Sequence, residues 1–181
     1  MKTFALIGAS GYIAPRHVEA IKHTRNNLMA CLDPYDGIGY IDKYFPNASY
    51  FKEAECFDRH LDRLKRKGNK IDYISICSPN YLHDSHIRLA LRGGSNVICE
   101  KPLVLKPEHL NSLKEIELET GGKINTILQL RLHPSIIKLK ENLKILVKNI
   151  KYLFNILHPE DYGMIIHGKV TKENLEELSL I

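Results

Sequence analysis

The residues best suited to bind a ligand form a glycine-rich segment, GASGYIA, that begins at Gly8. It lies between an apolar run at 3–7, which predicts a strand, and an amphipathic segment that predicts a helix. In dinucleotide-binding proteins one glycine turns the strand, a second lets the backbone approach the pyrophosphate, and a small third residue lets helix and strand pack closely. Gly8, Gly11 and Ala14 can fill these roles, with Ser10 at the usual second-glycine position. Amides at the helix start would then bind phosphate. The alternative is an ordinary glycine-rich turn.

An acidic residue follows the second predicted strand. Asp33 lies 22 residues after Gly11, directly after the apolar run 28–32. A carboxylate at this place accepts hydrogen bonds from the ribose hydroxyls of adenosine and repels a 2′-phosphate, which favours NAD over NADP. No arginine follows Asp33 directly, which also argues against NADP. The alternative is an ordinary turn residue before Pro34.

Two more polar segments begin where predicted strands end. CSPNYLH begins at Cys77, and CEKPL begins at Cys99. Ligands of open parallel sheets bind at the carboxyl edge of the strands, so both segments are expected at one site. From its surroundings alone, Lys101 could equally be an ordinary lysine at a strand end, held extended by Pro102.

Metal and disulfide chemistry is not indicated. His83 and His86 lie three residues apart on one predicted helix face, but no third ligand is spaced to join them. The four cysteines form no C-x-x-C pair, and three lie in apolar runs that predict buried strands. Buried free thiols behave as small hydrophobes and fit a reducing compartment. We therefore expect no metal site.

The elements that position these residues alternate along the chain. Short apolar runs predict strands at 3–7, 28–32, 73–77, 96–99 and 124–130. Helical spacing and stop signals predict helices at 14–22, 57–67, 82–91 and 107–120. Residues 33–51 are loop-rich, with a short helix around 41–44. This alternation predicts an α/β, Rossmann-type doubly wound parallel sheet of about six strands, covered on both faces.

A different character begins after residue 134. Residues 135–157 predict one long amphipathic helix or two, and a terminal helix is expected from Thr171. We therefore expect a dinucleotide-binding domain at 1–134 and a helical tail at 135–181. The helix at 135–157 could cover apolar surface or mediate contact with a partner or a second copy, while ordinary core packing is the alternative.

Composition narrows the class of protein. The chain has 181 residues, 44% hydrophobic and 26% charged, as in globular domains, with a formal net charge of +5. No apolar run reaches the 18–20 residues or so that a bilayer span needs, so no membrane segment is expected. The basic residues are typical of solvated helix faces. Aromatic residues are not interleaved with them to stack on bases, so we expect no nucleic-acid partner. We expect a cytoplasmic protein.

Four motifs in this order and spacing, GASGYIA, SPNYLH, EKPL and LQLRLHP, resemble the glucose–fructose oxidoreductase/inositol dehydrogenase (Gfo/Idh/MocA) family. Within it, the sequence is most similar to the UDP-N-acetylglucosaminuronic acid 3-dehydrogenases of O-antigen synthesis. The resemblance covers about residues 1–140. It implies oxidation of the C3 hydroxyl of a nucleotide sugar, with NAD as the hydride acceptor.

The resemblance also implies roles for individual residues. Those around the pyrophosphate would be Gly8, Ser10, Gly11, Tyr12 and Ile13, with Asp33 on the adenosine ribose. Those on the nicotinamide side would be Ser78, Asn80 and His83, with Glu100 on the nicotinamide ribose. Lys101 would be catalytic, beside cofactor and substrate, and would help to move the hydroxyl proton. Gln129 would border the cofactor and Arg131 would bind a carboxylate or phosphate of the substrate.

The sequence departs from the family after Arg131. Family members carry a second domain that holds the substrate and usually supplies a catalytic histidine. Neither His158 nor His167 lies in a comparable glycine-rich stretch, so we expect that domain to be absent or truncated. Hydride transfer needs the sugar held near the cofactor, so we expect NAD binding with weak or no turnover. The alternative is a non-catalytic NAD-binding or interaction module.

Overall fold

In the computed structural model, residues 1–36 and 39–157 are described. The chain divides into two compact units, Met1–Ile127 and Leu128–Ile181. The terminal helix expected from Thr171 lies outside the described residues. Among the helices that are described, none is long and apolar enough to cross a membrane.

The first unit is built on a parallel sheet of six strands in the order β3-β2-β1-β4-β5-β6. Its strands are β1 (Thr3–Ile7), β2 (Asn27–Leu32), β3 (Ser49–Phe51), β4 (Tyr73–Ile76), β5 (Asn96–Cys99) and β6 (Ile124–Thr126). The order runs outward from β1 in both directions, as in dinucleotide-binding folds. The predicted Rossmann-type α/β fold is therefore confirmed.

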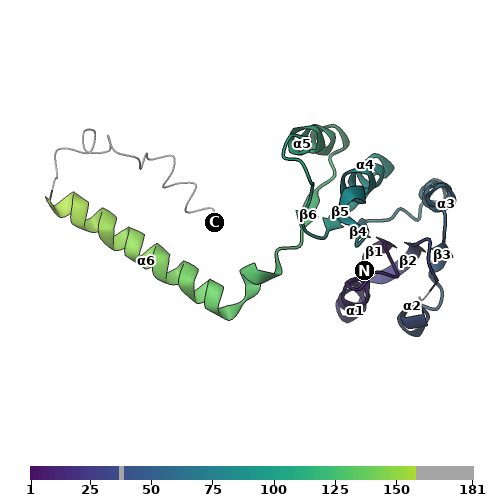
Figure 1. Ribbon diagram of the computed structural model, residues 1–181, viewed down its shortest axis with the longest axis horizontal. Helices are drawn as coiled ribbons and strands as arrows, with labels where there is room; N and C mark the ends of the chain where they lie inside the picture. The colour runs from purple at the N-terminus through teal and green to yellow at the C-terminus, as the bar shows by residue number, and fades with distance from the viewer. Residues whose placement is uncertain (37–38, 158–181) are drawn as a thin grey trace. The chain divides into compact units, whose positions relative to one another are not determined.

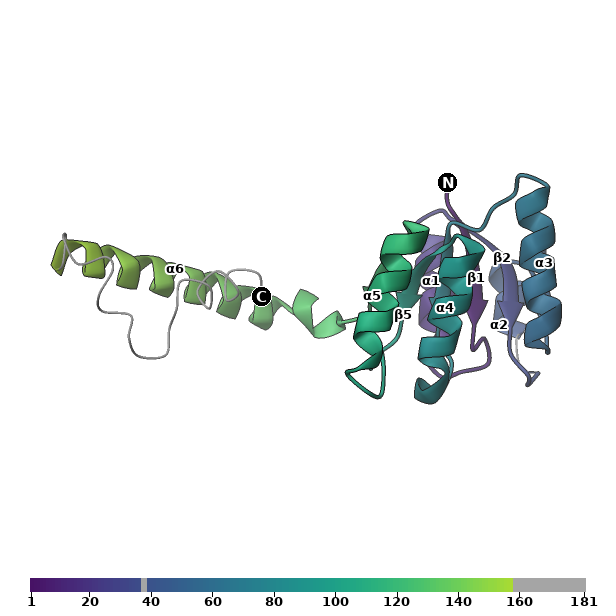
Figure 2. The same cartoon turned by 90° about the horizontal axis from the view of Figure 1, so that it is seen from above.

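Helices cover both faces of the sheet. They are α1 (Ala14–His23), α2 (Gly39–Tyr44), α3 (Ala54–Arg66), α4 (His83–Gly93) and α5 (His109–Thr120). One face carries α1 and α2, and the other carries α3, α4 and α5 (Figure 1). The view from above shows α3, α4 and α5 in front of the strands (Figure 2). Burial on both faces explains why the strands are continuous apolar runs.

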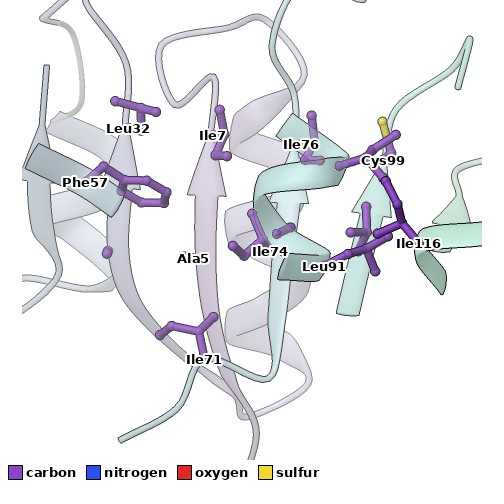
Figure 3. Packing of buried hydrophobic residues seen from close by; sticks show 14 of the residues in the cluster. Ala5, Ile7, Leu32, Phe57, Ile71, Ile74, Ile76, Leu91, Cys99 and Ile116 are labelled. Carbon is purple, nitrogen blue, oxygen red and sulfur yellow. The ribbon is translucent and has the colours of Figure 1, made fainter. Parts of the chain in front are cut away.

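The core alternates along each strand because successive side chains point to opposite faces of the sheet. On β1, Phe4 and Leu6 pack in the cluster toward α1 and α2, whereas Ala5 and Ile7 pack in the cluster toward the other three helices. Phe57 of α3 fills this second cluster (Figure 3). It is fully buried, and each such large side chain contributes about 1.5–3 kcal/mol.

The structure differs from the sequence prediction at two strands. The segment 33–51, predicted as loop with one short helix, also contains β3, which pairs with β2 at the sheet edge. The last strand ends at Thr126, and a 3₁₀ helix, Gln129–Leu132, occupies the end of the predicted strand. Tertiary pairing decides such short elements, because three residues carry too little pattern to predict a strand.

In the second unit, α6 (Pro134–Leu157) confirms the long helix expected near the C-terminus. Several of its large apolar side chains are exposed: Ile136, Ile137, Leu139, Leu143, Ile145 and Leu146. Contact of this helix with a partner or a second copy stays a prediction.

Candidate active site

The carboxyl edge of the sheet brings four of the predicted segments into one row. Ile7 of β1 is in register with Leu32 of β2 and with Ile76 of β4, and Ile76 is in register with Cys99 of β5. Backbone hydrogen bonds continue the ladder one residue further. The residues that follow these strands therefore lie side by side: Gly8, Asp33, Cys77 and Glu100.

Gly8 is required by the close packing of this edge. Its φ is +82°, and a Cβ atom there would lie 2.5 Å from the carbonyl carbon of Cys77 and from the amide nitrogen of Ser78. At Gly11, a Cβ atom would lie 3.1 Å from the carbonyl oxygen of Gly8. The two glycines thus let the loop after β1 lie against the end of β4.

Two backbone amides of this loop are available to a ligand. The N–H groups of residues 8–11 each donate a hydrogen bond within the protein. Across residues 1–36 and 39–157, the N–H groups of Tyr12 and Ile13 have no such acceptor. They lie directly before α1, where free amides and the positive end of the helix dipole attract anions. This arrangement fits the pyrophosphate of a dinucleotide.

Asp33 is buried beside the same loop, with 5% of its surface exposed. Its Oδ2 accepts a hydrogen bond of 2.9 Å from the Ser10 N–H, and its Oδ1 accepts one of 2.9 Å from the Tyr35 N–H. An ionised carboxylate offers about four acceptor positions. Two of these have no donor among the described residues, which fits the two hydroxyls of an adenosine ribose.

The loops after β4 and β5 are joined by a buried histidine. His83 has no exposed surface; its Nε2 lies 2.9 Å from the Ser78 carbonyl oxygen and its Nδ1 lies 2.7 Å from the Pro102 carbonyl oxygen. Both ring nitrogens are thus engaged within the protein. These contacts give His83 a positioning role between the two loops, and its place on the nicotinamide side of the cofactor stays a prediction.

A second histidine holds the Ser78 side chain, whose Oγ lies 2.9 Å from Nδ1 of His86. Burial, and then the neighbouring His83, lower the pKa of His86, so the neutral ring is favoured there. The Ser78 hydroxyl is therefore fixed by a neutral imidazole.

The remaining predicted residues are exposed. Asn80 and Lys101 form no side-chain hydrogen bond with the described part of the chain, so both are free to contact a ligand. Gln129 and Arg131 are exposed in the 3₁₀ helix of the second unit. Their place at the site stays a prediction.

Sequence reasoning missed three polar residues that organise this edge. Tyr40 of α2 donates a hydrogen bond to the Ala9 carbonyl oxygen, and Tyr50 of β3 donates one of 2.7 Å to the Asp33 carbonyl oxygen. His17 of α1 contacts Glu100. The signal for His17 was a serine inside the apolar run of β4, because a buried hydroxyl needs a partner.

The family model of the Gfo/Idh/MocA oxidoreductases, an oxidoreductase family with an NAD-binding Rossmann fold, matches residues 2–126. The chain belongs to the Gfo/Idh/MocA family. Its cofactor is NAD. Among these oxidoreductases, the WlbA (WbpB) dehydrogenase from Thermus thermophilus has been crystallised with NAD and UDP-GlcNAcA. That protein is 51% identical to this chain, with a TM-score of 0.78, over 80% of this chain and 47% of its own.

Two further relatives are less similar to this chain. D-glucoside 3-dehydrogenase from Escherichia coli is 32% identical over 132 residues, which cover 71% of this chain and 34% of the relative. Myo-inositol 2-dehydrogenase from Lactobacillus plantarum shares the fold, with a TM-score of 0.66 and 19% identity over 79% of this chain and 41% of its own. The chain thus spans a third to a half of the length of these Gfo/Idh/MocA proteins.

Proposed function

We propose that this chain acts in NAD-dependent oxidation of the C3 hydroxyl of a UDP-N-acetylhexosaminuronic acid. The observation that carries the proposal is the 51% identity, over 80% of the chain, to a dehydrogenase crystallised with NAD and UDP-GlcNAcA. The row of Gly8, Asp33 and Glu100 supports it, because a dinucleotide can lie along this edge with the pyrophosphate near Tyr12 and Ile13.

The site residues divide the work. The amides of Tyr12 and Ile13 bind the pyrophosphate, and Asp33 accepts hydrogen bonds from the hydroxyls of the adenosine ribose. Glu100 accepts a hydrogen bond from a hydroxyl of the nicotinamide ribose. NAD, when bound, accepts the hydride that leaves the sugar carbon.

Lys101 works at the reacting hydroxyl. The O–H proton must leave as the hydride leaves, so the Lys101 amine accepts that proton, and the ammonium that forms stabilises the developing alkoxide. Arg131 binds a carboxylate or phosphate of the substrate, and Gln129 borders the cofactor.

The cytoplasmic location stays a prediction.

The test is to mix the purified chain with NAD and UDP-N-acetylglucosaminuronic acid and to follow the NADH absorbance band. We expect the band to grow, at most slowly, only when both ligands are present, and Lys101→Met to abolish the growth while NAD still binds. A flat trace from a folded, NAD-bound chain would reject the catalytic proposal and favour the binding module.

A further inference from the structure

We infer that His17 is a positioning residue for Glu100, and that it sets the distance between the pyrophosphate site and the carboxylate that binds the nicotinamide ribose. The inference rests on the proposed function, because the ribose contact of Glu100 is part of it. His17 Nδ1 lies 2.6 Å from Ser75 Oγ, and His17 Nε2 lies 3.0 Å from Glu100 Oε1. His17 belongs to α1, Ser75 belongs to β4, and Glu100 directly follows β5.

Ser75 and Glu100 together fix the tautomer of the histidine. Ser75 is 1% exposed in a central strand of the sheet, so its hydroxyl needs a partner within the protein. Over the described residues, His17 is the one hydrogen-bond partner of that hydroxyl. The Glu100 carboxylate can only accept, so Nε2 carries the ring proton, and the Ser75 O–H donates to the unprotonated Nδ1. Nε2–H then donates to Glu100, which fixes the carboxylate.

Glu100 is held at two points and keeps one oxygen for a ligand. Its backbone N–H donates to the Ile76 carbonyl oxygen at 3.0 Å, and its Oε1 accepts from His17. Its Oε2 has no hydrogen-bond donor among residues 1–36 and 39–157, and the side chain is 13% exposed. One oxygen is thus bound to the protein, and the other can accept from a ribose hydroxyl.

The negative charge of Glu100 also raises the pKa of two neighbouring thiols. Burial, and then the negative charge of Glu100, raise the pKa of the Cys99 thiol to about 12. The same two causes, in the same order, raise the pKa of the Cys77 thiol. Both thiols are therefore neutral at physiological pH, and neither adds a negative charge to the Glu100 carboxylate.

The helix α1 connects the two ends of the site. Ile13, whose amide has no acceptor in the described part of the chain, lies directly before the helix, and His17 lies four residues later. This is about one helical turn, or roughly 6 Å along the axis. In NAD the pyrophosphate adjoins the nicotinamide ribose, so one turn of α1 carries both the phosphate donor and the histidine that orients the ribose acceptor.

The test compares three ligands by calorimetric titration: ADP, which lacks the nicotinamide ribose, ADP-ribose, which has it, and NAD. We expect the wild type to bind ADP-ribose and NAD more tightly than ADP. His17→Ala should lower the affinity for ADP-ribose and for NAD by about tenfold, which corresponds to the loss of one charge-assisted hydrogen bond. The affinity for ADP should change by less than about twofold. Glu100→Ala should give the same pattern, and the double variant no further loss.

Two more variants separate positioning from folding. His17→Gln keeps an N–H donor near the position of Nε2, so it should recover most of the ADP-ribose affinity. His23→Ala, an exposed histidine of the same helix, is the matched control and should change none of the three affinities. Nitrogen-15 NMR of labelled histidine should show the Nε2–H tautomer for His17 in the wild type and a tautomer mixture when both Ser75 and Glu100 are replaced by alanine.

Several outcomes would overturn the inference. Equal losses for ADP, ADP-ribose and NAD in His17→Ala would mean a general structural role. Unchanged NAD affinity, or a glutamine variant no better than alanine, would mean that the contact with Glu100 orients nothing. A wild type that binds none of the three ligands would contradict the proposed function itself.

Discussion

The carboxylate of Asp33 accepts a hydrogen bond of 2.9 Å from the backbone N–H of Ser10. The end of β2 is therefore tied to the glycine-rich loop that follows β1. The other carboxylate oxygen accepts from the Tyr35 N–H. One buried acid thus shapes the glycine-rich loop and keeps acceptor positions for the proposed contact with the adenosine ribose.

Asp33→Asn is expected to weaken NAD binding by about tenfold or more and to narrow the preference for NAD over NADP. The amide keeps part of the hydrogen bonding but loses the charge that strengthens it and that repels a 2′-phosphate. Titration calorimetry with NAD and NADP measures both effects. Asp36→Asn, an exposed carboxylate paired with Lys52 at 2.8 Å, is the control and should leave both affinities unchanged. An unaltered NAD preference in Asp33→Asn would contradict the assigned ribose contact.

Gly8→Ala is expected to unfold the domain or to lower its melting temperature strongly. The added Cβ would meet the backbone of Cys77 and Ser78 at 2.5 Å, and φ at this position is +82°. Thermal melting followed by circular dichroism checks this. Gly93→Ala is the control, because a Cβ there has no neighbour within 4 Å among the described residues. It lies at the end of α4 and should leave stability unchanged or raise it by up to about 1 kcal/mol. A Gly8→Ala protein as stable as the wild type would show that the loop can move away from β4.

Most of the fold followed from the sequence because its strands are apolar runs bounded by glycine, proline and polar residues. β1 and β5 have the predicted limits, and the helices differ from prediction by one to three residues at an end. β3 did not follow, because Ser49–Phe51 is short and only partly buried. Its pairing with β2 is a tertiary effect that local pattern does not carry.

Asp72 links the starts of β1 and β4, and it makes stability depend on pH. Its Oδ2 accepts a hydrogen bond of 2.9 Å from the Thr3 N–H, and its Oδ1 lies 3.0 Å from Lys2 Nζ. The bond from Thr3 above all holds the pKa of this carboxyl below its ordinary value of 3.8. Asp72→Asn should therefore cost about 1 kcal/mol of unfolding free energy at neutral pH.

The sign of this pH dependence follows from linkage. The folded state holds the Asp72 proton less tightly than the unfolded state, so the stabilisation is complete above the unfolded value and is lost as pH falls through the folded one. The difference between wild type and Asp72→Asn should shrink below about pH 4. Urea unfolding at several pH values measures it, with the exposed Asp62→Asn as control. A difference that stays constant down to pH 2 would show that ionisation of Asp72 contributes nothing.

The thiols should differ in reactivity. Burial, and then Asp42, raise the pKa of Cys31 to about 12, and Cys77 and Cys99 are also buried with raised pKa values. Cys56 of α3 is only partly buried. Iodoacetamide at mildly alkaline pH should therefore modify Cys56 first, and the other three only after local opening. Mass spectrometry of timed digests checks the order. Rapid alkylation of Cys31 in the folded protein would contradict its burial.

The candidate site was predictable where one residue type suits one task, as at Gly8 and Asp33. It was less predictable where a side chain acts through another. His83 joins two loops through backbone carbonyl oxygens. His17 contacts Ser75 and Glu100, which lie 58 and 83 residues after it in the chain. Such contacts depend on how helices, strands and loops pack together, so only the packed fold reveals them.

The most direct test of the account is a crystal structure of the chain grown with NAD. We expect the pyrophosphate against the amides of Tyr12 and Ile13, the adenosine ribose on Asp33, and the nicotinamide ribose on Glu100. A dinucleotide bound elsewhere, or an edge filled by the protein's own side chains, would contradict the account.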